Sequence, residues 1–402
     1  MSIHDLPRTA RRILLLTDCY RPAVNGVITS IVGLRDGLRA QGHDVRVLTF
    51  ADAKAAGFDG EVYRLPSIGA GAVYPHARLG RPMDRAVLRQ IVRWSPQVLH
   101  SHTEFVAYWW ARRLAHQLGS PHVHTYHTLY EDYTHYFCPN PRLGRAISAT
   151  LTRRVVGRAD HVIAPTGKIE SLLRGYGLAG PITVVPTGID LTRFSPTADA
   201  DEQETARLRQ SLGLRPGVPV VLSVGRLATE KNLGEAIGLL ARVRHLPWQA
   251  VIVGDGPQGG ALRDLVRRLH LSDRVCFTGA VPPDRVPAYF RLGDVFVSAS
   301  ASETQGLTCL EALASGVPAL CRADPCLEGV VRSGVNGWQY EGADDFVRVL
   351  GALLTDPALR RRWAHGAAVS GRDFGVPRFS EAVCRVYDEA SARLDGVRRR
   401  TA

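Results

Sequence analysis

The sequence predicts an α/β protein of two domains, each built on a doubly wound parallel sheet, that face each other across a cleft. The chain has 402 residues, more than one common domain holds, and 45% of them are hydrophobic, enough to fill two cores. Short apolar runs alternate with amphipathic helical patterns, and this alternation pauses near residue 188 and then resumes. We therefore expect domains at residues 1–188 and 189–373, followed by a C-terminal helix within residues 374–402.

The first half opens with a strand, a turn, a helix and a second strand. Residues 13–17 form a short apolar run, and the following turn carries Asn25 and Gly26. Residues 27–39 have apolar side chains at helical spacing and end before a glycine, which is a typical helix stop. The second strand is expected at residues 44–50, and further strands are expected at residues 97–100, 122–125 and 161–164.

The second half repeats this order after a polar, acidic stretch at residues 195–209. Its strands are expected at residues 218–224, 249–253, 275–277 and 295–298. Its helices are expected at residues 233–244 and 259–269, with another that starts near Gly306. The last helix, at residues 374–394, is expected to pack back on the first domain.

Composition argues against several classes of protein. No apolar run approaches the roughly 20 residues that cross a bilayer, and the first 12 residues do not lead into the apolar segment of a secretory signal. Seven cysteines without a CxxC pair indicate free thiols in a reducing cytoplasm. The formal net charge is +12, and residues 1–188 hold 23 basic but only 13 acidic residues. The positive charge is therefore concentrated in the first half.

Two segments of the first half combine this charge with apolar side chains. Arginines recur at helical spacing and are expected on one helix face, at Arg78, Arg81, Arg85, Arg89 and Arg93. A second segment has an apolar stripe among four arginines, formed by Leu143, Ile147, Leu151 and Val155. Because each basic side chain near an anionic leaflet contributes about 1 kcal/mol, peripheral membrane attachment is one interpretation. A solvated amphipathic helix is the other, and no nucleic-acid-binding signature is present.

Two glutamates, Glu303 and Glu311, lie eight residues apart on either side of a glycine turn. If a helix starts near Gly306, its free amides and the positive end of its dipole suit a phosphate. Glu303 would lie beside that phosphate, and Glu311 would reach a second part of the same ligand. Since carboxylates bind sugar hydroxyls, the pattern favours a nucleotide sugar, although two ordinary exposed glutamates are the alternative.

Two further glycine turns follow predicted strands of the second half. Gly225 and Arg226 follow one strand, with Lys231 five residues after the arginine, where open α/β sheets bind ligands. The two cations can hold a diphosphate and stabilise its charge as it leaves, or they are plain surface cations. Gly254 and Asp255 follow the next strand and either leave room for a base or ribose or form an ordinary turn.

Histidines gather near two strands of the first half, at positions 100, 102, 122, 124 and 127. No Glu-x-x-His motif, cysteine pair or helix-spaced histidine pair accompanies them, so we expect no metal. We place His127 in the polar lining of a sugar pocket and the other histidines in the core.

In this order and spacing, the motifs resemble those of retaining nucleotide-sugar glycosyltransferases of the GT-B fold, over most of the chain. The matching parts are Asn25-Gly26-Val27, His127, Pro186-Thr187-Gly188-Ile189-Asp190, Gly225-Arg226 with Lys231, Gly254-Asp255-Gly256-Pro257, and Glu303 with Glu311. Residues 124–133 and 302–307 look more narrowly like bacterial diacylglycerol glucosyltransferases, which are monotopic and make glycolipids at the cytoplasmic membrane face.

The resemblance implies a role for each of these residues. Arg226 and Lys231 would bind the donor diphosphate in place of a metal, and Gly26 would let the first-domain loop approach it. Glu303 would grip the sugar and phosphate together with the amides of Gln305, Gly306 and Leu307. Glu311 would hold the ribose, Gly225, Gly254 and Asp255 would complete the donor site, and His127 would contact the transferred sugar.

The chain departs from the wider family at three places. Thr304-Gln305 stands where Gly-Phe is common, Thr187 where Asn is common, and Asn25-Gly26 where two glycines are common. These departures leave the donor sugar open. We expect glucose transfer from UDP-glucose to a membrane diacylglycerol. The alternatives are mannose transfer from GDP-mannose to a lipid or small soluble acceptor, a non-catalytic nucleotide-sugar-binding protein, and a dinucleotide-dependent oxidoreductase, which lacks its glycine motif.

Overall fold

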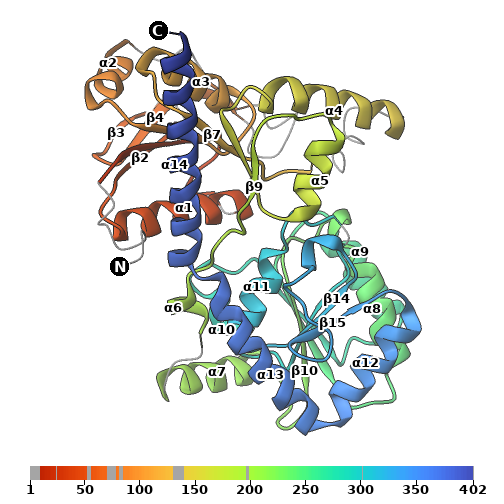
Figure 1. Ribbon diagram of the computed structural model, residues 1–402. Coiled ribbons are helices and arrows are strands. Elements are labelled where there is room, and N and C mark those ends of the chain that lie inside the picture. Colours follow the sequence, from red (N-terminus) through yellow and green to blue (C-terminus); the bar gives the residue numbers. More distant parts are fainter. Residues whose placement is uncertain are drawn as a thin grey trace, which may run out of the picture. The chain divides into compact units, whose positions relative to one another are not determined.

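The computed structural model describes residues 10–23, 25–51, 56–69, 78–80, 85–129, 140–195, 199–300 and 302–401. Contacts divide the chain into two compact units, one formed by Met1–Gly188 with Val376–Ala402 and the other by Ile189–Gly375. Each unit is a largely parallel sheet with helices on both faces (Figure 1). The predicted class of two doubly wound α/β domains is therefore confirmed.

The sheet of the first unit has the order β3-β4-β2-β1-β6-β7-β8-β9, with β5 paired to β4. Its strands are β1 (Arg12–Leu16), β2 (Asp44–Ala51), β3 (Gly57–Phe58), β4 (Val62–Gly69), β5 (Arg78–Gly80), β6 (Val98–Ser101), β7 (His122–Thr125), β8 (His161–Ala164) and β9 (Ile182–Val184). Only the short β3 and β5 run antiparallel to their neighbour. Because β1 lies between β2 and β6, the strand order reverses there, and ligands bind at the carboxyl ends of strands beside such a reversal.

Alternating side chains of β1 serve the two faces of this sheet. Ile13 and Leu15 pack with one cluster, which includes residues of α1 and α14, and Leu14 and Leu16 pack with another, which includes residues of α2 and α3. The helices of the unit are α1 (Gly26–Ala40), α2 (Arg85–Trp94), α3 (Val106–Leu118), α4 (Pro141–Val156), α5 (Gly167–Gly175) and α14 (Val376–Thr401). Burial of both faces explains why β1 reads as a continuous apolar run.

The C-terminal helix α14 completes the first unit. It packs along α1 (Figure 1), and Phe379, Val383 and Tyr387 enter the same core as Ile13. A Cβ at Gly37 of α1 would lie 2.7 Å from Ser380 and Val376, so only glycine permits this close approach. Each large apolar side chain buried here contributes about 1.5–3 kcal/mol.

The second unit has a parallel sheet in the order β12-β11-β10-β13-β14-β15. Its strands are β10 (Val220–Val224), β11 (Gln249–Val253), β12 (Val275–Gly279), β13 (Val295–Ser298), β14 (Ala319–Arg322) and β15 (Gly337–Tyr340). The chain runs outward from β10 in one direction and then returns to start β13 on its other side. The carboxyl ends of β10 and β13 are thus the expected ligand-binding edge.

Helices cover both faces of this sheet as well. They are α6 (Leu191–Phe194), α7 (Asp199–Ser211), α8 (Leu233–Arg242), α9 (Gly259–Arg268), α10 (Val286–Phe290), α11 (Leu307–Ala314), α12 (Ala343–Thr355) and α13 (Pro357–Gly371). Short 3₁₀ turns lie at η4 (Thr229–Lys231), η5 (Pro325–Leu327) and η6 (Arg372–Phe374). Val221 packs in a cluster with α8, α9 and α12, whereas Val220 and Leu222 pack in a cluster with α10 and α11.

Two local expectations were wrong. Arg78 was expected on a helix face with Arg85, Arg89 and Arg93, but it lies in β5, which pairs with β4, while Arg81 lies outside the described residues. The helix α2 begins only at Arg85. The polar stretch before β10 contains the helix α7, which lacked a strong apolar pattern because only one of its side chains, Leu208, enters the core. None of the helices in the described ranges is apolar over a stretch long enough to cross a bilayer.

Candidate functional site

The loop after β10 carries both predicted phosphate-binding cations. Gly225 adopts a φ of +150°, and no atom lies within 4 Å of the position its Cβ would take, so the backbone there is open to a ligand. Arg226 is exposed. The turn η4 follows, and Asn232 at φ +49° ends it and starts α8, which places Lys231 at the edge of the sheet.

Two glycines after β11 hold that loop in place. A Cβ on Gly254 would lie 1.9 Å from the carbonyl oxygen of Gly225, and one on Gly256 would lie 2.5 Å from that of Leu227. The Gly225 amide donates to Val253 O at 2.9 Å, and the Leu227 amide donates to Asp255 O at 3.0 Å. The space beside Gly254 is therefore filled by the neighbouring loop. Asp255 is exposed, and its Oδ1 accepts from the amide of Gly256 at 2.8 Å.

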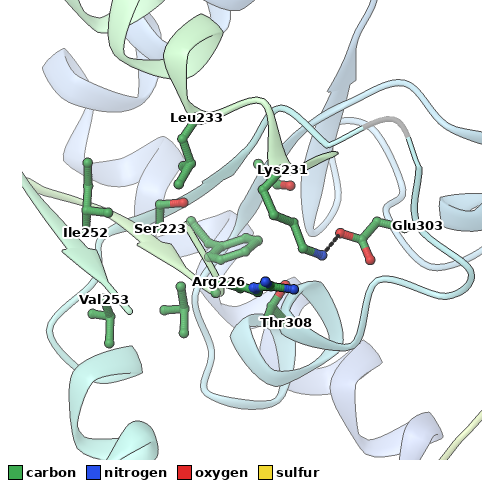
Figure 2. A pocket seen from close by; sticks show the side chains of 12 residues that line it. Ser223, Arg226, Lys231, Leu233, Ile252, Val253, Glu303 and Thr308 are labelled. Atoms are coloured by element: carbon green, nitrogen blue, oxygen red, sulfur yellow. Dashed lines mark hydrogen bonds and ion pairs between the residues drawn. The ribbon is translucent and has the colours of Figure 1, made fainter. Parts of the chain in front are cut away.

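Lys231 and Glu303, which are 72 residues apart in sequence, form a direct ion pair (Figure 2). Their side chains are 30% and 18% exposed, so both charges remain reachable from solvent. The hydroxyls of Ser300 and Ser302 donate to the carbonyl oxygen of Glu230, which ties the loop after β13 to the turn before Lys231. The sequence predicted both charges as site residues but did not predict that they pair.

The helix α11 begins directly after this pair. Gly306, at φ +73°, caps it, and Gln305 is buried. The amides of Leu307 and Thr308 make no backbone hydrogen bond within the described part of the chain, so two donors at the positive end of the helix dipole are available. This is the anion-binding geometry expected from the sequence.

These elements line one hollow at the carboxyl ends of β10 and β13 (Figure 2). It encloses about 330 Å³ of empty space, including the solvent at its mouth. Its wall consists of Ser223, Val224, Gly225, Arg226, Lys231, Leu233, Ile252, Val253, Phe296, Ser298, Glu303 and Thr308. Four predicted residues thus share one wall, whereas Ser223, Ser298 and Thr308 were not predicted. The polar position at each strand end was the signal that would have indicated the two serines.

Glu311 lies one turn further along α11 and is only partly exposed. Burial raises the pKa of its carboxyl group to about 7, and the nearby charge of Arg193 opposes this shift. No hydrogen bond to its carboxylate occurs among the residues described. A carboxylate that is desolvated and lacks a donor is well suited to accept hydrogen bonds from ligand hydroxyls.

The first unit holds a network of buried histidines at the carboxyl ends of β6 and β7. His102 Nδ1 and His127 Nε2 are 3.1 Å apart, and Ser101 Oγ lies between His122 Nε2 at 2.7 Å and His124 Nδ1 at 2.8 Å. Burial, reinforced by His124, lowers the pKa of His127 to about 3, so this imidazole is neutral at physiological pH. His127 is half-buried, whereas the other four rings are almost completely buried.

The remaining predicted features of the first unit are simpler. Asn25 is the N-cap of α1, with its Oδ1 accepting from the amide of Ile28 at 2.9 Å, and Gly26 is the first residue of the helix. Residues 130–133 of the predicted sugar-pocket motif lie outside the described residues. No set of three or more His, Cys, Asp or Glu side chains arranged for a metal occurs in the described ranges.

Comparison with known proteins assigns both halves of the chain. Residues 24–193 match the model of Glycosyltransferase Family 4, and residues 204–369 match that of Glycosyl transferases group 1. An alpha-monoglucosyldiacylglycerol synthase of Streptococcus pneumoniae is 34% identical over 383 residues, covering 94% of this chain and 86% of that protein. The chain belongs to the GT-B glycosyltransferases.

Other relatives of this glycosyltransferase extend the comparison. An alpha-monoglucosyldiacylglycerol synthase of Acholeplasma laidlawii is 30% identical, covering 94% of this chain and 96% of that protein. A D-inositol 3-phosphate glycosyltransferase of Xylanimonas cellulosilytica is 33% identical over 74% of this chain and 72% of its own. The predicted family and the prediction of a hexose-transferring enzyme are therefore confirmed.

Solved structures support the fold of this glycosyltransferase. HepE of Anabaena, crystallised with UDP and glucose, has a TM-score of 0.71 at 20% identity and covers 94% of this chain and 100% of its own. Sucrose-phosphate synthase of Thermosynechococcus elongatus has a TM-score of 0.72 at 22% identity, covering 95% of this chain and 100% of its own. The predicted GT-B fold is confirmed.

Proposed function

We propose that this glycosyltransferase moves glucose from UDP-glucose to a diacylglycerol at an anionic membrane surface, with retention at the anomeric carbon. The observation that carries the proposal is similarity along 94% of the chain to two proteins named as alpha-monoglucosyldiacylglycerol synthases. UDP-glucose is itself an α-glycoside, so an α-linked product requires net retention. The boundaries predicted at residues 188 and 373 agree with a division into an acceptor domain and a donor domain.

The donor would bind in the second unit. Arg226 and Lys231 would neutralise the diphosphate, and the amides at the start of α11 would donate to its oxygens. Glu303 would then exchange its pairing with Lys231 for hydrogen bonds to sugar hydroxyls. The carboxylate of Glu311 would accept from the ribose hydroxyls. Two cations in this position supply the charge stabilisation that a divalent ion gives in other transferases, which supports transfer without a metal.

Retention fits a reaction on one face of the sugar. The bond from C1 to the diphosphate oxygen breaks, and the bond from C1 to the acceptor oxygen forms on the same face. The acceptor hydroxyl proton passes to the departing diphosphate oxygen, whose growing charge Arg226 and Lys231 stabilise. Of the predicted residues, His127 would contact the sugar as a neutral hydrogen-bonding group.

The helix α4 supports a lipid acceptor because its polarity is reversed. Its buried face consists of Gly144, Ser148, Thr152 and Val156, whereas Leu143, Ile147 and Leu151 are 55%, 40% and 56% exposed. Arg142, Arg145, Arg153 and Arg154 flank this outward stripe and are exposed. A solvated helix of a water-facing protein has the opposite arrangement, so a surface helix of this kind fits a membrane interface.

The magnitudes favour membrane attachment over a solvated helix. Burial of three large aliphatic side chains in lipid contributes about 1.5–3 kcal/mol each, and the four arginines add about 1 kcal/mol each near anionic lipid. Two such signals together give stable peripheral attachment. Since nucleotide sugars are made in the cytoplasm, we place the enzyme on the inner face of the cell membrane. The described cysteines are all unpaired, which agrees with that compartment.

A soluble acceptor is the second candidate. The chain is also 33% identical to a D-inositol 3-phosphate glycosyltransferase, although over a shorter part of its length. The outward stripe of α4 favours the lipid. A mannosyltransferase that uses GDP-mannose and a non-catalytic nucleotide-sugar-binding protein remain alternatives from the sequence.

One experiment separates these proposals. Purified full-length protein is incubated with labelled UDP-glucose, UDP-galactose, UDP-N-acetylglucosamine or GDP-mannose. Each donor is offered diacylglycerol in anionic vesicles, diacylglycerol in neutral vesicles, or inositol 3-phosphate in solution. We expect label from UDP-glucose in a lipid product, more with anionic vesicles, unaffected by EDTA and with an α anomeric proton coupling. Label only in a soluble product, transfer only from GDP-mannose, or no transfer would each contradict the proposal.

A further inference from the structure

We propose that His102, which none of the motifs or relatives singles out, is a positioning residue that fixes the ring orientation and tautomer of His127. The geometry behind this assignment lies entirely within the first unit. The consequence for the rate rests on the sugar-transfer function proposed above, whereas the consequence for the tautomer does not.

The two rings are held together by one hydrogen bond and by stacking. His102 Nδ1 and His127 Nε2 are 3.1 Å apart, and their ring centroids are 5.4 Å apart at an interplanar angle of 23°. His102 is 1% exposed, and its amide donates to Leu16 O at 2.9 Å, which fixes its backbone to the end of β1. Among the described residues, no other side chain makes a hydrogen bond to the ring of His127.

A second layer of contacts holds His102 itself. The ring of His100 packs on it with centroids 4.1 Å apart. His100 is in turn fixed by Tyr387 Oη on Nδ1 and by Thr125 Oγ1 on Nε2, each at 2.8 Å. The orientation of His127 therefore depends on a chain of contacts that ends on α14.

The protons in this pair can be counted. Burial lowers the pKa of both imidazoles well below physiological pH, so each ring carries one proton and only one proton lies between the two nitrogens. His102 Nε2 is buried and has no partner among the described residues. A buried N–H group is almost never left unpaired, so the proton of His102 belongs on Nδ1, where it is donated to His127 Nε2. His127 must then carry its proton on Nδ1.

This tautomer gives His127 a defined chemical role. Its Nε2 is occupied, and its Nδ1–H is a neutral donor on the half-buried side of the ring. A neutral donor can bind a sugar oxygen without placing a positive charge beside the anomeric carbon, where positive charge develops during transfer. Loss of His102 frees the ring to rotate and to exchange tautomers, so the rate falls although the donor still binds in the second unit.

The test combines NMR with kinetics on the full-length chain. Selective ¹⁵N-histidine labelling, with His127 assigned from its own substitution, reports which ring nitrogen carries the proton. His102→Leu removes the hydrogen bond, and His102→Asn restores a donor because its amide nitrogen occupies the position of Nδ1. His161→Leu is the matched control, since His161 is also buried in this unit and bonds only to Thr183 Oγ1, at 2.8 Å, in its hydrogen-bond network.

We expect the proton of His127 on Nδ1 in the native protein and a mixture of tautomers in His102→Leu. We expect kcat of His102→Leu to fall by about tenfold to a hundredfold, as for a small misplacement of a reacting group, with KM for the donor nearly unchanged. His102→Asn should recover most of the rate. A native His127 protonated on Nε2 would overturn the proposal, as would a His102→Leu enzyme whose kcat matches that of His161→Leu. If the native protein transfers no sugar, the tautomer measurement alone decides the proposal.

Discussion

The raised pKa of Glu311 predicts that donor affinity depends on pH. Ribose hydroxyls donate to the ionised carboxylate, and a pKa of about 7 means that the ionised fraction falls about tenfold between pH 8 and pH 6. We therefore expect the Kd for UDP-glucose to rise about tenfold over this range. Glu311→Gln should bind the donor more weakly at pH 8, by about 1.5–3 kcal/mol for loss of a charged acceptor, and should show no such dependence.

The same substitution should stabilise the protein. The folded state raises the pKa from 4.5 to about 7, so ionised Glu311 opposes folding above pH 7, and this penalty disappears as the pH falls towards 4.5. The shift corresponds to about 3 kcal/mol. Because the side chain is partly exposed, solvent screening leaves about 1–2 kcal/mol. Each kcal/mol raises Tm by about 2–4 °C for a unit of this size.

Calorimetric titration with UDP-glucose and thermal unfolding at pH 6, 7 and 8 measure the two effects. UDP-glucose is the suitable ligand because its diphosphate diester does not titrate in this range, unlike free UDP. The control is Glu341→Gln, an exposed glutamate of the same unit. A Kd that is constant from pH 6 to pH 8 in the native protein would refute the reasoning, as would a Glu311→Gln variant that loses stability at pH 8.

Three further predictions concern other parts of the molecule. Lys231→Ala or Glu303→Ala should each lower kcat by about a hundredfold to a thousandfold with an unchanged circular dichroism spectrum; near-normal turnover of either variant would exclude the assigned role. The double variant Ile147→Ser with Leu151→Ser should lose at least tenfold in binding to anionic vesicles by flotation, whereas the exposed Val369→Ser should not, and equal recovery of both would remove α4 from the membrane surface. Gly254→Ala should destabilise the protein by about 2 kcal/mol or more, because its Cβ meets Gly225 O and its φ is +131°, while Gly238→Ala, which meets nothing within 4 Å, should leave Tm unchanged or raise it; similar Tm values for the two would contradict the loop packing.

The order of strands and helices was predictable because burial on both faces leaves a strong local signal. Apolar strands such as β1 and β10 and their following helices were identified within a few residues. Arg78 was placed wrongly because arginines at helical spacing resemble a helix face even where the backbone is extended. The helix α7 was missed because helices with one buried side chain have almost no apolar pattern.

The site was predictable as a set of residues but not as a set of contacts. Glu303 and Lys231 stood out by residue type and by position after a strand, yet their ion pair joins positions 72 apart. Similarly, the apolar stripe of α4 was visible in the sequence, but its direction depends on which face the sheet covers. The link from His102 to His127 joins two strand ends, β6 and β7, whose register no local pattern contains.

The packing of α14 against α1 sets a time order for the birth of this molecule on the ribosome. The second unit is contiguous, so it can close as soon as residue 375 has left the exit tunnel. The first unit, although made first, must wait for its last segment, a delay of roughly 10 to 40 s at ordinary rates of synthesis. During that interval the inner surface of α1 has no cover, and any truncation before residue 376 makes the exposure permanent. Premature stop codons near the end of this gene should therefore yield a chain that is cleared by chaperones and proteases and not a merely shortened enzyme.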